Sequence, residues 1–233
     1  MTTEMIRQYS LLVDFLGRTL GPDYEIALHD LGKKQSIVAI ANGHISGRTI
    51  GAPLTNVAMQ AIAERTYETQ NYYLSHRGLS ADGRLLRSSN FYIKDEHGKL
   101  VGLLCINFDD SRYQQLSELV FSLCHPDEYA EQNISIGALQ LSAENTEDET
   151  FYSSIASAAD AALLSVMNSS SVPTDRLTQD EKMEIVGLLN SKGIFMLKGA
   201  VNEVADRLSC SPASIYRYLG KLNRKKNSTN YNT

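Results

Sequence analysis

Two amphipathic helical patterns, separated by a short polar break, occupy residues 200–226 of the 233-residue chain. The first pattern places its apolar residues on one side of a helical wheel: Val201, Val204, Ala205 and Leu208. Ser211 is positioned to cap a second helix, and Pro212 takes its first position, where the missing N–H costs nothing. The apolar stripe of that second helix consists of Ile215, Tyr218, Leu219 and Leu222. This feature requires a small helical domain at the C-terminal end.

The outward face of the second helix is small at its start and basic further along. Two helices joined by a three-residue turn, with a basic second helix, are typical of a helix-turn-helix, whose second helix enters the DNA major groove. Small residues let the helix approach base edges, Arg217 can reach a guanine or a phosphate, and the lysines can neutralise phosphates. The predicted DNA-binding residues are Ser211, Ala213, Ser214, Tyr216, Arg217, Lys221, Arg224 and Lys225.

The alternative interpretation of this stretch is a packed helix pair with a solvated basic end. The order V-x-x-V-A-x-x-L-S-x-S-x-x-S-I-Y-R-Y-L resembles the helix-turn-helix of serine recombinases and of several bacterial regulators, which favours DNA binding. Charge supports the same interpretation: residues 173–233 hold ten Lys and Arg against six Asp and Glu, although the whole chain has a net charge of −5. Double-stranded DNA is therefore the expected partner of the basic part.

Composition and motifs exclude several other classes. No run approaches 18 apolar residues and the N-terminus lacks a signal-peptide pattern, so we expect a cytoplasmic protein with no membrane partner. Cys105, Cys124 and Cys210 are odd in number and scattered, which predicts buried reduced thiols without disulfides. The five histidines lack metal-ligand spacing, and catalytic and phosphate-loop motifs are absent from the sequence. We expect no metal, no cofactor and no enzyme activity.

The N-terminal half predicts helices and antiparallel strands. Helical spacing runs from residue 4 to residue 20, strands are expected at 24–30 and 36–40, and a helix is expected at 54–68. Polar, glycine-containing connections are expected around Gly78 and Gly83. Residues 84–95 and 99–109 form the clearest hairpin, joined by a turn that ends in Gly98.

This order, ending with D-E-H-G-K-L-V-G-L-L-C-I-N-F-D-D, resembles a PAS domain. Read together, N-G-H-I-S-G-R-T-I-G-A-P-L-T at 42–55 and G-I-F-M-L-K-G-A-V-N-E-V-A at 193–205 resemble the YheO-like PAS plus helix-turn-helix regulators, over most of residues 4–115 and 176–223. The resemblance implies an α+β fold: a PAS-like antiparallel sheet with helices, followed by an all-α three-helix helix-turn-helix domain. It also implies DNA binding.

We expect the N-terminal PAS-like domain to sense either a small molecule or another protein, and a small molecule requires an effector site. A PAS sheet commonly forms one wall of a pocket, and the polar residues on the loop and the hairpin are the candidates for a small-molecule effector. They are His44, Arg48, Asn90, Cys105 and Asn107. The alternatives are that Arg48 pairs with a structural carboxylate and that Asn90 is a solvated edge residue.

The expected domains are a PAS-like sensor at 1–124, an acidic linker with a connecting or dimerisation helix at 125–172, and a helix-turn-helix domain at 173–233. Residues 144–149 are expected to be a solvated linker, and an apolar stripe over 155–166 suits either a dimer helix or packing on the sensor. A capping box at Thr178 begins the first DNA-binding helix, whose Ile185, Leu188 and Leu189 are expected in the core. Because one recognition helix covers a short half-site, a homodimer is expected. The competing hypothesis is a signalling adaptor that works through protein contacts alone.

Overall fold

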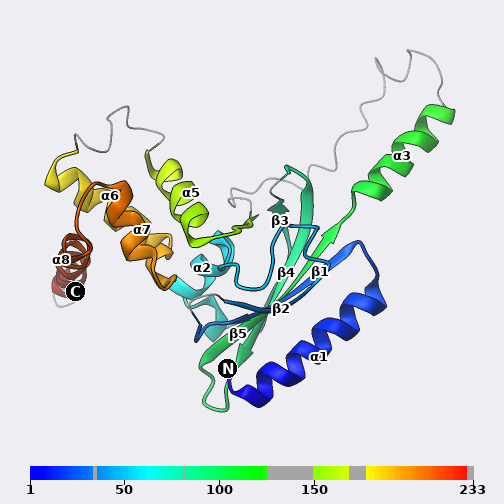
Figure 1. The fold of residues 1–233 in the computed structure, drawn as a ribbon, viewed down its shortest axis with the longest axis horizontal. Coiled ribbons are helices and arrows are strands. Elements are labelled where there is room, and N and C mark those ends of the chain that lie inside the picture. The colour runs from blue at the N-terminus through cyan, green and yellow to red at the C-terminus, as the bar shows by residue number, and fades with distance from the viewer. Residues whose placement is uncertain (34–35, 81, 125–148, 168–176, 230–233) are drawn as a thin grey trace.

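The computed structural model describes residues 1–33, 36–80, 82–124, 149–167 and 177–229, with the backbone alone for 223–229. Its N-terminal half is a six-stranded sheet in the order β2-β1-β5-β4-β3-β6 (Figure 1). The strands are β1 (Tyr24–Asp30), β2 (Ile37–Ala41), β3 (Tyr72–Leu79), β4 (Leu85–Lys94), β5 (Leu100–Asp109) and β6 (Glu149–Thr150). Neighbours are antiparallel except β3 and β6, so the two expected hairpins, β1–β2 and β4–β5, are confirmed.

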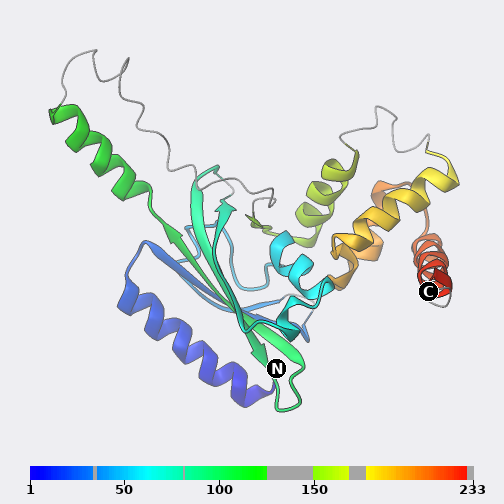
Figure 2. The same ribbon diagram turned by 180° about the vertical axis from the view of Figure 1, so that it is seen from behind.

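Helix α1 (Thr3–Leu20) covers one face of this sheet (Figure 2). Its N-cap is Thr2, whose hydroxyl accepts a hydrogen bond from the backbone N–H of Met5. Val13 packs with Ile26 and Leu28 of β1, which project from alternate positions of that strand. Gly17 lies directly against Ala41 of β2, so even a methyl group at Gly17 would collide with the sheet.

The opposite, inner face of the sheet points toward α2 (Asn56–Ala63) and the C-terminal helices (Figure 1). Ala27, Tyr92, Leu103 and Cys105 lie on this side and share one hydrophobic cluster with Ala58 and Met59 of α2. The single helix expected over 54–68 is divided into α2 and the 3₁₀ helix η1 (Thr66–Glu68), because Arg65 between them has a φ of 59°.

Strand β3 is an element that the sequence pattern missed. The stretch around Gly78, expected to be a connection, is extended and pairs with β4 over most of its length. Its outer neighbour is only the two-residue β6, and most of its side chains are at least partly exposed. An edge strand of this kind carries polar residues and glycine, which removes the apolar alternation on which strand prediction depends.

Helix α3 (Ser111–Cys124) extends away from the sheet (Figure 1), and none of its residues is buried. Cys124 at its end is exposed, whereas Cys105 is buried and Cys210 is partly buried. The expectation of three buried thiols was therefore wrong for Cys124, because this helix has no packed layer over it. Leu116, Leu119, Val120 and Leu123 of α3 are each more than half exposed.

The C-terminal helices are α5 (Ile155–Met167), α6 (Gln179–Ser191), α7 (Ala200–Arg207) and α8 (Pro212–Thr229), with the 3₁₀ helix η3 (Ile194–Met196). The capping box at the start of α6 is confirmed, since Thr178 and Glu181 exchange both hydrogen bonds. The buried stripe of α5 packs against α6 and α7, partners that neither interpretation of the stripe named. Ile185 and Leu189 of α6 are buried as expected, but Leu188 is 47% exposed because it faces away from this core.

The α+β fold class is confirmed, with a PAS-like curled sheet followed by a helical region (Figure 2). The two parts share one hydrophobic cluster, which runs from the inner face of the sheet through α2 to η3 and the C-terminal helices. At the junction Gly193 has a φ of 76°, and a Cβ there would lie 2.9 Å from the carbonyl oxygen of Met59. Glycine therefore permits both the local backbone turn and the close approach of η3 to α2.

Candidate DNA-binding and effector-binding sites

Helix α8 has one buried side and one open side. Ile215 is completely buried and Tyr218 is 4% exposed, and both belong to the core formed with α6 and α7. On the other side, Ala213, Arg217 and Lys221 are exposed and follow each other at four-residue intervals, which places them in one row along the helix. Nothing lies within 4 Å of a Cβ built at Gly220, so this face is uncovered.

The break between α7 and α8 has the geometry expected for a helix-turn-helix. Ser209 has a φ of 48°, and the Ser211 hydroxyl accepts a hydrogen bond of 3.2 Å from the backbone N–H of Ser214. This is the N-cap that the sequence predicts, with Pro212 as the first helical residue. The cap fixes the direction in which α8 leaves the turn.

The structure places most of the predicted DNA-binding residues at the surface of α8. Ser211, Ala213, Tyr216, Arg217 and Lys221 are exposed, and Ser214 is half-buried. Arg217 lies 5.5 Å from the ring centroid of Tyr218, so among the described residues its contact is with an aromatic face. Arg224 and Lys225 are on α8, but their side chains lie outside the described residues.

A different arginine of the helix-turn-helix is engaged internally. Arg207 of α7 forms an ion pair with Asp160 of α5, and its Nη2 also donates to the backbone oxygen of Ala156 at 3.2 Å. The Asp160 hydrogen bond raises the pKa of Arg207, and the same bond lowers the pKa of Asp160. Arg207 therefore fastens α7 to α5 and is not free for DNA.

The second site is a buried polar cluster on the inner face of the sheet. Arg48, in the loop after β2, donates from Nη2 to Glu25 Oε1 at 2.7 Å and from Nε to Ser46 Oγ at 3.0 Å. Glu25 also accepts from Asn107 Nδ2 at 2.8 Å, and Arg48 and Glu25 are 2% and 0% exposed. Arg48 thus pairs with a structural carboxylate, while its guanidinium lies 4.6 Å from the centroid of the Phe151 ring.

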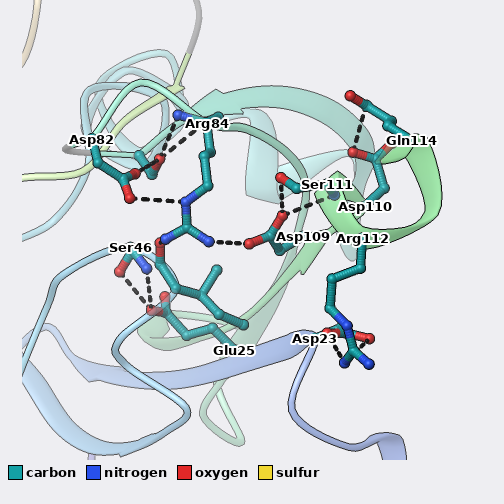
Figure 3. A network of polar contacts seen from close by, with 12 residues as sticks. Asp23, Glu25, Ser46, Asp82, Arg84, Asp109, Asp110, Ser111, Arg112 and Gln114 are labelled. Carbon is teal, nitrogen blue, oxygen red and sulfur yellow. Dashed lines mark hydrogen bonds and ion pairs between the residues drawn. The ribbon is translucent and has the colours of Figure 1, made fainter. Parts of the chain in front are cut away.

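An arginine network holds this loop in position (Figure 3). Arg84 binds Asp82 of the preceding turn at 2.9 Å and Asp109 at the end of β5, and it donates to the backbone oxygen of Ile45 at 3.0 Å. Asp109 also accepts from the backbone N–H of Ser111 at the start of α3. The loop that carries Ser46 and Arg48 is therefore tied to the open end of the β4–β5 hairpin, where β4 begins and β5 ends.

Five buried polar atoms of the described residues have no hydrogen-bond partner: Arg48 Nη1, His76 Nδ1, Ser88 Oγ, Asn90 Oδ1 and Asn107 Oδ1. They belong to one region. His76 and Ser88 are register partners across β3 and β4, and Ser88 and Asn107 are partners across β4 and β5. Buried polar groups in folded proteins are nearly always paired, so a concentration of unpaired ones marks a place where water or another molecule supplies the missing hydrogen bonds.

The candidate effector residues divide into two groups. Arg48, Asn90, Cys105 and Asn107 all lie buried on or against the inner face, and Asn90 is no solvated edge residue because it is 3% exposed. His44 is exposed in the loop and is not brought to this cluster. Burial raises the pKa of the Cys105 thiol, which keeps it protonated and unreactive.

The sequence analysis missed Glu25, His76, Ser88 and Glu149. Glu149 was expected in a solvated linker, but it is 1% exposed, and the remainder of that linker lies outside the described residues. Its carboxylate accepts from Thr55 Oγ1 at 2.7 Å and pairs with His76 Nε2 at 2.9 Å. Burial by itself raises the pKa of Glu149. The hydrogen bond with His76 outweighs that effect together with the other partners, so the pKa of Glu149 is lowered overall. The polar alternation of Ser88 and Asn90 along β4 was the one signal available.

A cleft of about 980 Å³ opens beside this cluster. One wall consists of α2, η1 and the inner faces of β3 and β4, including Tyr73, His76 and Tyr92. The other wall comes from the C-terminal part, including Ala161 and Ala162 of α5 and Ile194 of η3. A molecule in this cleft would contact the PAS-like half and the helical half together.

His29 on β1 makes the stability of the PAS-like core depend on pH. Burial, and then the charge of Arg48, lower the pKa of His29 to about 3, and its Nδ1 lies 2.9 Å from the Ser36 hydroxyl. The unfolded chain takes up a proton near the ordinary pKa of 6.5, whereas the folded chain does not do so until about pH 3. The stability contributed by neutral His29 is therefore present above pH 6.5 and is lost as the pH falls.

We expect the wild-type chain to be about 2 kcal/mol less stable at pH 5 than at pH 7 from this residue. Urea unfolding of His29→Leu at both pH values should show a correspondingly smaller difference. His97→Leu is the matched control, because the His97 side chain is 82% exposed. An equal loss in the wild type and His29→Leu would contradict the assignment.

No group of three metal-ligating side chains occurs in the described part of the chain. Within the same ranges, every helix is too short or too polar to span a bilayer.

Comparison with known proteins identifies both halves. The model of the YheO-like PAS domain family matches residues 1–125. The chain belongs to this family. The model of a helix-turn-helix domain matches residues 159–220, which include α6, α7 and the first part of α8. These are the domains of a DNA-binding regulator, and they confirm the family resemblance and its PAS plus helix-turn-helix organisation.

Relatives of this YheO-like protein match over nearly the whole chain. The protein YheO of Escherichia coli K12 is 28% identical over 220 residues, covering 93% of this chain and 84% of YheO. A protein of Haemophilus influenzae is 28% identical over 228 residues, covering 95% and 93%. The transcriptional regulator DauR of Pseudomonas aeruginosa is 24% identical over 217 residues, covering 93% and 94%.

Proposed function

We propose that the protein is a transcriptional regulator that binds operator DNA through α8 and senses a small molecule through its PAS-like half. The observation that supports DNA binding is the exposed row of Ala213, Arg217 and Lys221 on the side of α8 opposite the buried Ile215 and Tyr218. Such a helix is held rigidly while its outer face remains free for a groove of DNA. The name of the relative DauR supports the same role.

Each exposed residue has a proposed task in that complex. Ala213 and Ser214, near the start of α8, allow close approach to base edges, and the capped N-terminus favours a phosphate. Arg217 reads a base or binds the adjacent phosphate, and Lys221 binds a phosphate further along the helix. Tyr216, which is 64% exposed, contacts the sugar-phosphate backbone beside them.

We further propose that the regulator acts as a dimer. Two recognition helices spaced by one helical turn of DNA, about 34 Å, bind more tightly and specifically than one. Helix α3 supports this proposal because Leu116, Leu119, Val120 and Leu123 form an exposed apolar row. A row of this kind is a suitable surface for a second copy of the chain.

DNA titration tests the regulator. A genomic fragment selected by the purified full chain, titrated at two salt concentrations, should bind with a steep loss of affinity as salt rises and with two chains per fragment. Arg217→Ala should weaken specific binding by roughly 5- to 150-fold, and Lys221→Ala should reduce the salt slope by about 1.

The control is Arg18→Ala, since Arg18 on α1 has an 81% exposed side chain that pairs with nearby Asp14. It removes one positive charge and should leave the titration unchanged. A signalling adaptor that works only through protein contacts would show no salt-dependent binding and no effect of Arg217→Ala, which would refute the proposal.

A further inference from the structure

The outer face of the sheet, opposite the inner face, carries a helix mainly over one of its halves. Helix α1 contacts β1 and β2, and it lies along that side of the sheet (Figure 2). Because a helix is about 10 Å across and strands lie about 4.8 Å apart, one helix covers about two strands. The outward-facing residues of β3 and β4 lie beyond the reach of α1 and are largely exposed.

The exposed outer face of β3 and β4 is apolar where it meets water. Along β4, buried residues of the inner face alternate with exposed residues of the outer face. Tyr72 and Phe91 are register partners across the two strands, as are Leu79 and Leu85, and these four side chains are 37% to 54% exposed. The water-facing side of an antiparallel sheet normally carries polar residues. An apolar surface of this kind indicates contact with another protein surface.

Helix α3 matches this surface in character and in length. Its apolar residues, which recur at helical spacing and are at least 52% exposed, are Leu116, Leu119, Val120 and Leu123. The helix has 14 residues and is therefore about 21 Å long. The outer face from Leu85 to Phe91 spans about 20 Å along β4. A helix with an uncovered apolar row and a sheet with an uncovered apolar half are thus complementary.

Within its own chain, α3 is held away from this surface. It begins at Ser111, and the carboxylate of Asp109 at the end of β5 accepts hydrogen bonds from the backbone N–H and the hydroxyl of Ser111. Arg112 in the first turn pairs with Asp23 at 2.9 Å. These contacts direct α3 away from the sheet (Figure 1 and Figure 2). Its apolar row is therefore presented to another chain.

Charge favours the same pairing. Arg77 and Arg87 are register partners on the outer face of β3 and β4, where like charges in register repel. The one basic residue of α3 is Arg112, which Asp23 already binds. The last turn of α3 has no basic residue and carries the negative end of the helix dipole. Packing that end of α3 near the two arginines would reduce their repulsion.

We infer that α3 of one chain packs on the outer face of β3 and β4 of a second copy, at Tyr72, Leu79, Leu85 and Phe91, and that the second copy returns the same contact. Two-fold symmetry makes such an exchange reciprocal and closed. The apolar residues of the two surfaces present on the order of 800 Å² per chain, so the pair would bury about 1,600 Å², the size of a standard stable interface. The inference specifies the interface of the proposed dimer and rests on that proposal.

Sedimentation equilibrium of the full chain without DNA tests the inference. The wild type should have twice the 25.8 kDa mass of the chain. Leu119→Lys brings a positive charge against the arginines of the sheet, and Phe91→Glu places a charge in the apolar contact. Each should weaken dimerisation at least about 100-fold, because every dimer contains the change twice.

Leu11→Lys is the matched control, because Leu11 on α1 is 61% exposed and Leu119 is 56% exposed. It should keep the wild-type dimer. Far-UV circular dichroism checks that each variant folds, and Leu85→Glu at the other end of the same surface replaces Phe91→Glu if that variant does not fold.

An equal mixture of Leu119→Lys and Phe91→Glu distinguishes the reciprocal exchange from other dimers. In a mixed dimer one contact is wild-type, and the other brings the new lysine and the new glutamate together. The mixture should therefore dimerise at a concentration at which neither variant does so alone. A dimer formed only between the two α3 helices would be insensitive to Phe91→Glu, and one formed through α1 would be lost in Leu11→Lys.

Either of those results, or a mixture that associates no better than its components, would overturn this interface and leave the proposed dimer standing. A monomeric wild type would overturn both. None of these measurements involves DNA, so a failure of operator binding would not affect their interpretation.

Discussion

Replacement of Arg48 by methionine is expected to lower the free energy of unfolding by about 3–5 kcal/mol. The substitution leaves the Glu25 carboxylate, which is 0% exposed, without the guanidinium that neutralises it 2.7 Å away. It also removes the cation from the face of the Phe151 ring. Urea unfolding followed by far-UV circular dichroism measures the effect, since the chain has no tryptophan to report on this site.

Two further variants isolate the cause. Glu25→Gln combined with Arg48→Met removes the stranded charge and should recover most of the lost stability. Arg18→Met on the exposed side of α1 should leave the unfolding midpoint unchanged, because that arginine is solvated. An Arg48→Met protein with a wild-type midpoint would contradict the buried ion pair.

Replacement of Ile215 by alanine is expected to cost about 2–5 kcal/mol and to abolish DNA binding. Ile215 is completely buried in the core beneath α8, so the change creates a cavity there. This core is small, and its stability is therefore marginal. The packing of Ile215 in this core also sets the orientation of the exposed Arg217 and Lys221. Urea unfolding of the full chain and titration of the selected fragment measure the two effects.

Ile50→Ala serves as the matched control, because the Ile50 side chain in the loop before α2 is 68% exposed. It removes the same atoms without opening a cavity and should leave both stability and DNA binding close to wild type. If Ile215→Ala unfolded at the wild-type urea concentration, the helix-turn-helix core described above would be incorrect.

The helix-turn-helix was predictable because its signals are local. The Ser211 cap, the Thr178 capping box and the 3.6-residue spacing of Ile215 and Leu219 depend on neighbours only a few residues away. The inner-face site was predictable only in part. Arg48 and Asn107 stood out as polar residues beside apolar strands, but their partner Glu25 resembled an ordinary strand residue.

The missed elements depend on contacts that are distant in sequence. Glu149 is bound by Thr55, 94 residues earlier, and by His76, 73 residues earlier. Its acidic surroundings in the sequence predict solvation, and only the tertiary structure buries it. Strand β3 was missed for a related reason, since its extended form is fixed by pairing with β4 and not by its own composition.

The close contact of the Gly193 backbone with Met59 bears on the distance between the two α8 helices in a dimer. Because Gly193 has no side chain, the backbone before η3 lies directly against the carbonyl oxygen of Met59 in α2, and a larger residue there would push the helical half away from the sheet. In a paired molecule, the gap between the two α8 helices is then governed by how the sheets are placed as well as by the helices themselves. For the proposed dimer, we therefore expect the PAS-like half to influence which spacing of DNA half-sites the two α8 helices can span.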